Sequence, residues 1–459
     1  MAIARISTWV RLSSFGTGFD ITPKIVNLTG YLTVAPTPST LQQSGAIISV
    51  GGTTLAANAY QFIGTLSQLT SLLSTTGNYA ELNNMATTFF AQGSAVGFYV
   101  LELGLVTGVD AQITALETWI TDNPGVFYAY LTPADWDSSK DEVGSVIITL
   151  GGSGYTAAPT VTFSAPTSGT TATGTANIQN GEVISVTITD PGSGYTSAPT
   201  VTFSAPTSGS TATGTANLAS AFNILSGNYT NPTSKTYFFG TTSVSTITNY
   251  SPNKSLFLVA PAPTAPSTEF TAAAFFYQWL VNSPSASNML APMSYRYLYG
   301  VTPWAPTSGN QTTMTTILSN YGNLVDTGAE GGISNSCVFK GTTMDGSQAS
   351  WWYGVDWFQI QVKQAQAAAV INGSNSQPPL LYDQHGVNTL LGVANAVGNS
   401  AVSFGCALSV VITATPFYTY TQQNPANYKA GVYGGFLASV TGQNGFLQLN
   451  FVLDAIQFA

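Results

Sequence analysis

The most constraining feature of this sequence is a tandem duplication near its middle. Residues 152–177 read GSGYTAAPTVTFSAPTSGTTATGTAN, and residues 192–217 repeat them with two substitutions. The duplication extends upstream of these residues, where EVGSVIIT from Glu142 matches EVISVTIT from Glu182. Each unit holds a β-branched alternating run, a GSGY turn and a second run, PTVTF, which is typical of strand, turn and strand. The pattern predicts a small all-β module of two near-identical units over residues 139–219.

The sequence on either side of the repeats alternates between strand and helix patterns. Residues 97–103 and 126–131 are apolar strand candidates, and residues 109–122 between them carry an apolar stripe at helical spacing. This order predicts a β-α-β unit with a parallel strand pair. Strands at 236–240 and 255–260 and a helix at 272–281 continue the pattern. We therefore predict an α/β (α+β mixed) core whose repeat module is inserted at a loop and projects outward.

Further elements follow from periodicity. Two amphipathic helices are predicted between residues 60 and 92, one through Phe62, Leu66, Leu69 and Leu73 and one through Leu82, Met85 and Phe89. The last third predicts helices at 350–370 and 387–397 and strands at 404–414 and 431–440. Both ends of the chain are strand-like: residues 2–12, and residues 445–453, in which apolar and polar side chains alternate.

The composition is poor in charge. Lys and Arg number 10 and Asp and Glu 19, giving a net charge of −9, and charged residues are 6% of the chain, against about 25% in an ordinary soluble protein. So few basic residues argue against nucleic-acid binding, and no run of about 20 apolar residues suggests membrane insertion. A surface of Ser, Thr, Asn and Gly can meet a partner without desolvating ions. The composition suits a large assembly, although a stable extracellular β-rich protein fits it equally well.

Catalytic chemistry finds little support. The single histidine, His385, is expected to be packed or exposed rather than a base, and Asp135-Trp136-Asp137 is expected to be a capped turn rather than a cation site. Asp141-Glu142 is interpreted as solvated surface. Cys337 and Cys406 make no disulfide framework and are expected to be buried thiols. Without a secretion signal, we expect a protein made and used inside a cell or released by lysis, with no enzymatic activity, cofactor or metal.

A family resemblance rests on six segments outside the repeats. They are YVLELG from Tyr99, ITALETWITDNPGVFYAYLTPADWD from Ile113, NPTSKTYFF from Asn231, DWFQIQV from Asp356, PPLLYDQHGVNTL from Pro378 and the C-terminal GVYGGFLASVTGQNGFLQLNFVL. In this order they resemble the sheath protein of contractile phage tails of the myovirus type. The GSGYTSAPTVTF units resemble repeats that recur in phage structural proteins and bacterial surface proteins.

The resemblance implies a non-enzymatic structural subunit of the virion, assembled in the host cytoplasm. Such proteins form a helical homopolymer of stacked hexameric rings around a tail tube protein, between baseplate and tail terminator proteins. Contraction of the sheath drives the tube through the host envelope for genome ejection. The repeat module has no counterpart in a minimal sheath protein, so only an exposed position is expected for it.

The resemblance also implies terminal arms that add strands to a neighbour's sheet, and the sequence supports this, since a lone terminal strand needs backbone partners. The alternative is that both ends pair within their own subunit. The predicted arm residues are Ile3, Ile6, Trp9, Leu12, Phe446, Leu447, Leu449, Phe451 and Leu453. The predicted hinges are Gly16, Gly18, Gly442 and Gly445.

The predicted organisation has six parts: an N-terminal arm (1–20), the first part of an α/β domain (21–138), the repeat module (139–219), the second part of the α/β domain (220–340), a C-terminal core (341–444) and a C-terminal arm (445–459). Two other functions stay open. One is another self-assembling phage or surface-layer structural protein. The other is a carbohydrate-processing protein or surface adhesin that uses the β-repeats.

Overall fold

The body of the protein is built on one six-stranded sheet. The computed structural model describes residues 5–6, 38–137, 142–250, 252–304, 309–327 and 335–447. The strand order is β13-β12-β5-β2-β4-β3, and all neighbours are parallel except the β3–β4 pair. The strands are β2 (Gly45–Ser49), β3 (Tyr60–Ile63), β4 (Phe98–Glu102), β5 (Ala129–Leu131), β12 (Tyr237–Thr241) and β13 (Leu256–Val259).

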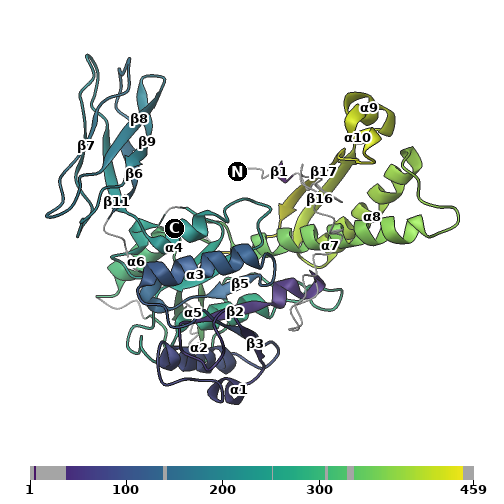
Figure 1. Cartoon of the computed structure of the whole chain (residues 1–459), viewed down its shortest axis with the longest axis horizontal. Coiled ribbons are helices and arrows are strands. Elements are labelled where there is room, and N and C mark those ends of the chain that lie inside the picture. The colour runs from purple at the N-terminus through teal and green to yellow at the C-terminus, as the bar shows by residue number, and fades with distance from the viewer. Residues whose placement is uncertain are drawn as a thin grey trace, which may run out of the picture.

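Alternate residues of these strands face two separate apolar cores. Ile47 and Phe239 belong to one core, and their neighbours Ile48 and Phe238 belong to the other, as the two-residue period of a strand requires. Helices cover both faces, with α3 and α2 on opposite sides of the sheet (Figure 1). The first core receives α1 (Leu66–Thr70), α2 (Tyr79–Ala91) and α5 (Thr271–Leu280), and the second receives α3 (Val109–Asp122), α4 (Ala221–Gly227) and α6 (Gln311–Ser319). The parallel strands are therefore buried on both faces and are rich in apolar residues.

Most predicted elements of the body are confirmed, and two predictions are wrong. The strand at 97–103, the helix at 109–122 and the strand at 126–131 are present, but β4 and β5 are not neighbours, because the buried strand β2 lies between them. Residues 60–63 form strand β3 rather than the start of a helix. Thr65 and Gln68 form a capping box that begins α1 only at Leu66, while Phe62 lies opposite Tyr99 on β4.

The repeats fold into strands that pair across the two units. The pairs are β6 with β11, β7 with β10, and β8 with β9, all antiparallel. The strand-turn-strand pattern suggested that each GSGY segment closes a hairpin within its own repeat unit. Instead, each of these strands pairs with a strand of the other unit. The strands are β6 (Val143–Leu150), β7 (Val161–Phe163), β8 (Thr173–Gln179), β9 (Glu182–Asp190), β10 (Val201–Phe203) and β11 (Thr213–Leu218).

The contacts between the two units are duplicated as faithfully as the sequence. The hydroxyl of Tyr155 donates to Ser204 O at 3.2 Å, and that of Tyr195 donates to Ser164 O at 3.2 Å. These strands enclose an apolar cluster of their own and extend away from the six-stranded sheet (Figure 1). Where they meet the body, Ala219 N donates to Glu142 O at 2.7 Å, so the two ends of the repeats lie side by side.

The last part of the chain extends from the body on the opposite side (Figure 1). Helices α7 (Ala349–Ser374) and α8 (Gln384–Ser403) pack together, and α8 supports an antiparallel pair, β16 (Ala407–Ala414) and β17 (Phe436–Gly442). Both predicted helices and both predicted strands are confirmed. Helix α8 is longer than expected at both ends, and Asp383 caps its beginning by accepting from Gly386 N. The remaining elements are β14 (Leu324–Thr327), β15 (Ser336–Phe339), α9 (Phe417–Gln423), α10 (Pro425–Lys429) and the 3-10 helices Pro38–Gln43, Ala134–Trp136 and Ile247–Asn249.

Candidate subunit-attachment site

The C-terminal sheet has an edge that accepts a strand. The outer edge of β17 pairs with β1 (Arg5–Ile6), with Arg5 opposite Ser439 and Ile6 opposite Ala438. This pairing lies within one chain. Of the predicted N-terminal arm only Ile6 is in the described chain; Ile3, Trp9, Leu12, Gly16 and Gly18 lie outside it.

One face of this sheet packs on α8, and the other is exposed. Val410 of β16 lies against Gly398 of α8. A Cβ added at Gly398 would lie 3.0 Å from Cγ1 of Val410. On the exposed face, Val411 and Leu437 are 60% and 49% accessible. Isolated exposed apolar residues are ordinary, but a set of them on a bare sheet face beside a strand-accepting edge is typical of an interaction surface.

The root of this C-terminal extension is fixed to the body by buried polar contacts. Asp356 of α7 is fully buried and accepts hydrogen bonds from the hydroxyls of Tyr128 (3.0 Å) and Tyr237 (2.8 Å). Burial raises the pKa of Asp356, while the charges of Lys254 and Lys235 lower it. Because Tyr128 precedes β5 and Tyr237 begins β12, these bonds fasten α7 to the central sheet.

Two glycines set how closely the hairpin approaches α7. A Cβ at Gly354 would lie 2.1 Å from the carbonyl oxygen of Cys406, and a Cβ at Gly442 would lie 2.3 Å from the Trp351 indole. Gly442 is the last residue of β17. The close approach of Trp351 requires glycine at this position, whether or not the residue is a hinge. Its role as a hinge stays a prediction.

A side chain at the start of α7 holds the chain where the predicted C-terminal arm begins. Gln348 donates to Gly445 O at 2.8 Å and accepts from Gly445 N at 2.7 Å. The hydroxyl of Tyr295 donates to Leu447 O, and Phe446 is 78% exposed. Residues 445–447 are not a strand; Leu449, Phe451 and Leu453 lie outside the described residues. The Gln348 side chain bonds both the N–H and the C=O of Gly445, as a partner residue in a β-bridge would. No sequence motif predicts this contact.

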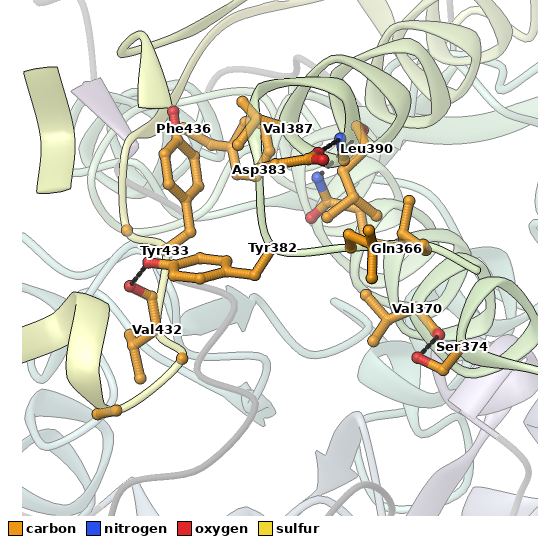
Figure 2. Close-up of a pocket in the computed structure, with 16 residues that line it drawn as sticks. Gln366, Val370, Ser374, Tyr382, Asp383, Val387, Leu390, Val432, Tyr433 and Phe436 are labelled. Carbon is orange, nitrogen blue, oxygen red and sulfur yellow. Dashed lines mark hydrogen bonds between the residues drawn. The ribbon is translucent and has the colours of Figure 1, made fainter. Parts of the chain in front are cut away.

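A cavity of about 240 Å³ lies beside the hairpin, between α7, α8 and residues 430–436 (Figure 2). Val370, Val387 and Leu390 give it an apolar wall, and Tyr433 and Phe436 lie at the side where β17 begins. The hydroxyl of Tyr382 donates to Val432 O at 2.7 Å, which holds the 430–436 segment against the helices. The cavity therefore lies beside the beginning of β17, the strand that pairs with β1.

The residues considered for catalysis do not converge on a site. Asp135 and Trp136 lie in a 3-10 helix after β5, and Asp137 accepts hydrogen bonds from Thr246 (2.6 Å) and Tyr250 (3.0 Å), so it serves a turn. His385 is exposed in the first turn of α8. Cys337 and Cys406 are buried and form no disulfide, as predicted. Within the described ranges, no group of three metal-ligating side chains occurs and no helix is long and apolar enough to span a membrane.

Comparison with known proteins identifies the fold. No protein-family model and no curated protein matches the sequence. Among solved structures, a chain of the anti-feeding prophage baseplate matches with a TM-score of 0.50 and 10% identity, covering 95% of this chain and 100% of that one. The contracted helical sheath of the anti-feeding prophage matches at TM-score 0.47, with 10% identity and coverage of 95% and 100%. The sheath tail protein Lin1278 from Listeria innocua matches at 0.35, with 11% identity and coverage of 81% and 88%.

The chain therefore has the fold of a chain of the anti-feeding prophage baseplate. The likeness shows the fold alone.

Proposed function

We propose that this protein is the sheath subunit of a contractile phage tail. It forms stacked hexameric rings around a tail tube protein, between the baseplate and a terminator protein, and contracts to drive the tube through the host envelope. The observation that carries the proposal is a fold shared with a baseplate chain over 95% of this sequence. The protein acts as a non-enzymatic part of the virion and is assembled in the host cytoplasm.

Subunits are joined by their terminal arms. The N-terminal arm of one subunit adds a strand to the β17 edge of another, and residues 445–459 add a strand to a neighbour from the point where Gln348 holds Gly445. The occupied edge of β17 supports this proposal, because an identical strand from another copy can make the same bonds. Each backbone hydrogen bond contributes about 1 kcal/mol net, so many arms around a ring give a durable mesh.

The repeats form an inserted module, residues 139–219, on the outside of the tail. The adjacent ends of this segment support the insertion, since a loop whose ends lie close tolerates an added domain. The α/β domain (21–138 and 220–340) and the C-terminal core (341–444) then make up the contractile body.

Negative-stain microscopy of the purified protein tests the proposal. We expect hollow cylinders with a striation from stacked rings. Planar lattices or shells would instead favour a surface-layer or capsid-type protein, and particles that stay monomeric at high concentration would contradict both. A chain lacking residues 1–20 is the control, since it keeps the folded body and loses one arm; it should form no cylinders.

A further inference from the structure

A lysine meets a buried glutamine where α7 packs against the chain that leads into β12. Lys235, two residues before β12, donates from Nζ to Oε1 of Gln359 on α7 at 2.9 Å. The Gln359 side chain is fully buried, and its Nε2 donates to Pro232 O at 3.2 Å. These two bonds fix the orientation of the amide, with its oxygen toward the lysine and its nitrogen toward Pro232. The amide carbon, Cδ, is therefore one covalent bond away from the atom that the amine contacts.

The Lys235 amine is suited to act as a nucleophile. A lysine attacks a carbonyl group in its neutral form, and burial or a neighbouring cation makes that form accessible near neutral pH. Burial is the main cause that lowers the pKa of Lys235 from 10.5 to about 8; the charge of Asp356 opposes this shift, and the charges of Lys363 and Lys254 add to it. Near pH 8, about half of the Lys235 side chains are therefore neutral.

A third group, Asp356, can carry the proton that such an attack releases. Asp356 lies one helical turn before Gln359 on the same face of α7, and its carboxyl is fully buried. Its Oδ2 accepts from the hydroxyls of Tyr128 and Tyr237, whereas its Oδ1 makes no hydrogen bond to any part of the chain that the structure describes. Buried polar atoms are rarely left without a partner. Burial also raises the pKa of Asp356, which favours a carboxyl that takes up and returns a proton.

We propose that Lys235 and Gln359 become joined by an isopeptide bond, with Asp356 as the proton carrier. Nζ of Lys235 forms a bond to Cδ of Gln359, and the Cδ–Nε2 bond breaks. The proton that Nζ gives up passes through the Asp356 carboxyl to Nε2, and ammonia leaves. The product is a secondary amide between the two side chains. No oxidant, cofactor or other reactant takes part, because the fold already holds the amine against the amide.

The bond fastens the C-terminal extension to the body covalently. Lys235 and Gln359 are 124 positions apart in the chain, and they belong to the same two segments that the hydrogen bonds of Asp356 hold together. A covalent link that closes a long loop reduces the conformational freedom of the unfolded chain. The joint between β12 and α7 therefore stays closed under conditions in which polar contacts alone would open. This inference goes beyond the proposed function and does not depend on it.

Mass spectrometry of the denatured full-length chain tests the bond. After the folded protein has stood at about pH 8, we expect a mass lower by one ammonia than the sequence requires. Proteolysis should then release a branched peptide that contains both Lys235 and Gln359, which separates this loss from ammonia lost elsewhere in the chain. The Lys235→Arg variant keeps the positive charge but has no amine, so it should show neither change. Lys363→Arg is the matched control, since it alters an exposed lysine nearby and should leave the mass loss complete.

Two results would overturn the inference. One is a native protein that keeps the full mass of its sequence, and the other is an equal mass loss, with the same branched peptide, in Lys235→Arg. The mass of the native protein decides the bond itself, whether or not every variant folds.

The role of Asp356 is tested separately with Asp356→Asn, which keeps the shape of the side chain and removes its acid. We expect the branched peptide to accumulate about a hundredfold more slowly, since a positioned acid or base contributes about 10²–10⁴-fold. Circular dichroism shows whether this variant is folded, and Tyr128→Phe is its control, because it removes one hydrogen bond to the same carboxyl and keeps the acid. A folded Asp356→Asn protein that forms the bond as fast as Tyr128→Phe would contradict the role of Asp356 as proton carrier.

Discussion

Single buried side chains decide how the loops of the body are held. Glu102, at the carboxyl end of β4, is 1% exposed and accepts hydrogen bonds from the hydroxyls of Ser49 (2.5 Å) and Thr53 (2.7 Å). It also accepts from the backbone N–H groups of Gly51, Thr53 and Gly104 at 2.7 to 3.1 Å. One carboxylate thus satisfies donors from two loops, the one that follows β2 and the one that follows β4.

Replacing Glu102 by Ala should lower the free energy of unfolding by about 3 kcal/mol or more, because hydrogen bonds to a charged group contribute about 1.5–3 kcal/mol each and buried donors lose their partner. Chemical denaturation with guanidinium measures the change. Glu117→Ala is the matched control, since Glu117 makes one bond at the surface, to Asn228 at 2.8 Å; its effect should stay under about 1 kcal/mol. Similar losses in both variants would contradict the role given to Glu102.

Two half-buried carboxyls near the 3-10 helix Ala134–Trp136, Glu81 and Asp137, make stability depend on pH. Burial raises the pKa of Glu81 from 4.5 to about 7 and that of Asp137 from 3.8 to about 7. The folded state therefore holds these protons more tightly than the unfolded chain. Their contribution to stability is complete below pH 4 and is lost as the pH rises through 7.

We expect the denaturation midpoint to be higher at pH 5 than at pH 8, with the two groups together contributing about 2 kcal/mol after allowance for solvent screening. Glu81→Gln/Asp137→Asn removes both titrations and should flatten this part of the profile. A double variant with an unchanged profile would show that other groups control it.

At the scale of elements, the repeats form one unit only because each completes the other. The backbone at Gly154 has φ +80°, and a Cβ there would lie 1.9 Å from Ser208 O; at Gly194 the values are +80° and 1.7 Å from Ser168 O. These approaches join the GSGY loop of one copy to the SAPTSG segment of the other. The GSGY glycines are thus needed for contact between the two repeat units of one chain rather than for a hairpin turn.

Either Gly154→Ala or Gly194→Ala should open the repeats selectively, with faster hydrogen exchange across β6–β11 and unchanged exchange in the central sheet, because a side chain is strained at positive φ and collides with backbone. The two variants should behave alike, since the contacts are duplicated. Gly227→Ala is the control, because a Cβ there meets nothing within 4 Å. If hydrogen exchange increased equally in the central sheet and in the repeats, the prediction that the repeats open independently of the sheet would be contradicted.

At the scale of the whole molecule, two extensions leave the sheet-based body: the repeats, and the C-terminal helices with their hairpin. The repeats leave the body between the 3-10 helix Ala134–Trp136 and α4, and return to almost the same point. The C-terminal extension is instead tied to the central sheet through Asp356.

Deleting residues 139–219 and joining the ends with a short linker should leave a protein that folds and still forms cylinders. Circular dichroism with thermal melting and microscopy check the two parts of this prediction. Removal of the β16–β17 hairpin, residues 407–442, is the contrasting deletion and should abolish cylinders. Loss of assembly on deleting the repeats would contradict an outward, non-assembling position for them.

Low charge makes a prediction about the assembly itself. Charged residues are 6% of the chain, so packing and hydrogen bonds should dominate the contacts between subunits. The fraction of protein that sediments as polymer should change little between 0.05 and about 0.5 M salt, where surface charges are strongly screened. Ready dissolution at the higher concentration would show that ion pairs hold the polymer.

Periodicity in the sequence determined much of this fold. The stripe Ile113, Leu116 and Ile120 predicts α3, and the alternation in the C-terminal third predicts β16 and β17, because burying an apolar face needs a fixed local spacing. The alternating β-branched runs within each repeat predict an all-β segment for the same reason. These features depend on residues within about ten positions of one another.

Only the tertiary structure decided which strands meet. Nothing near residues 45–49 says that β2 enters between β4 and β5, that β7 pairs with β10, or that Gln348 bonds the backbone of Gly445. Partner choice across long separations depends on competition among many similar apolar surfaces, which local spacing does not encode. The candidate attachment site belongs to this second category, because β1 and β17, the strands that pair there, lie more than 350 residues apart in the chain.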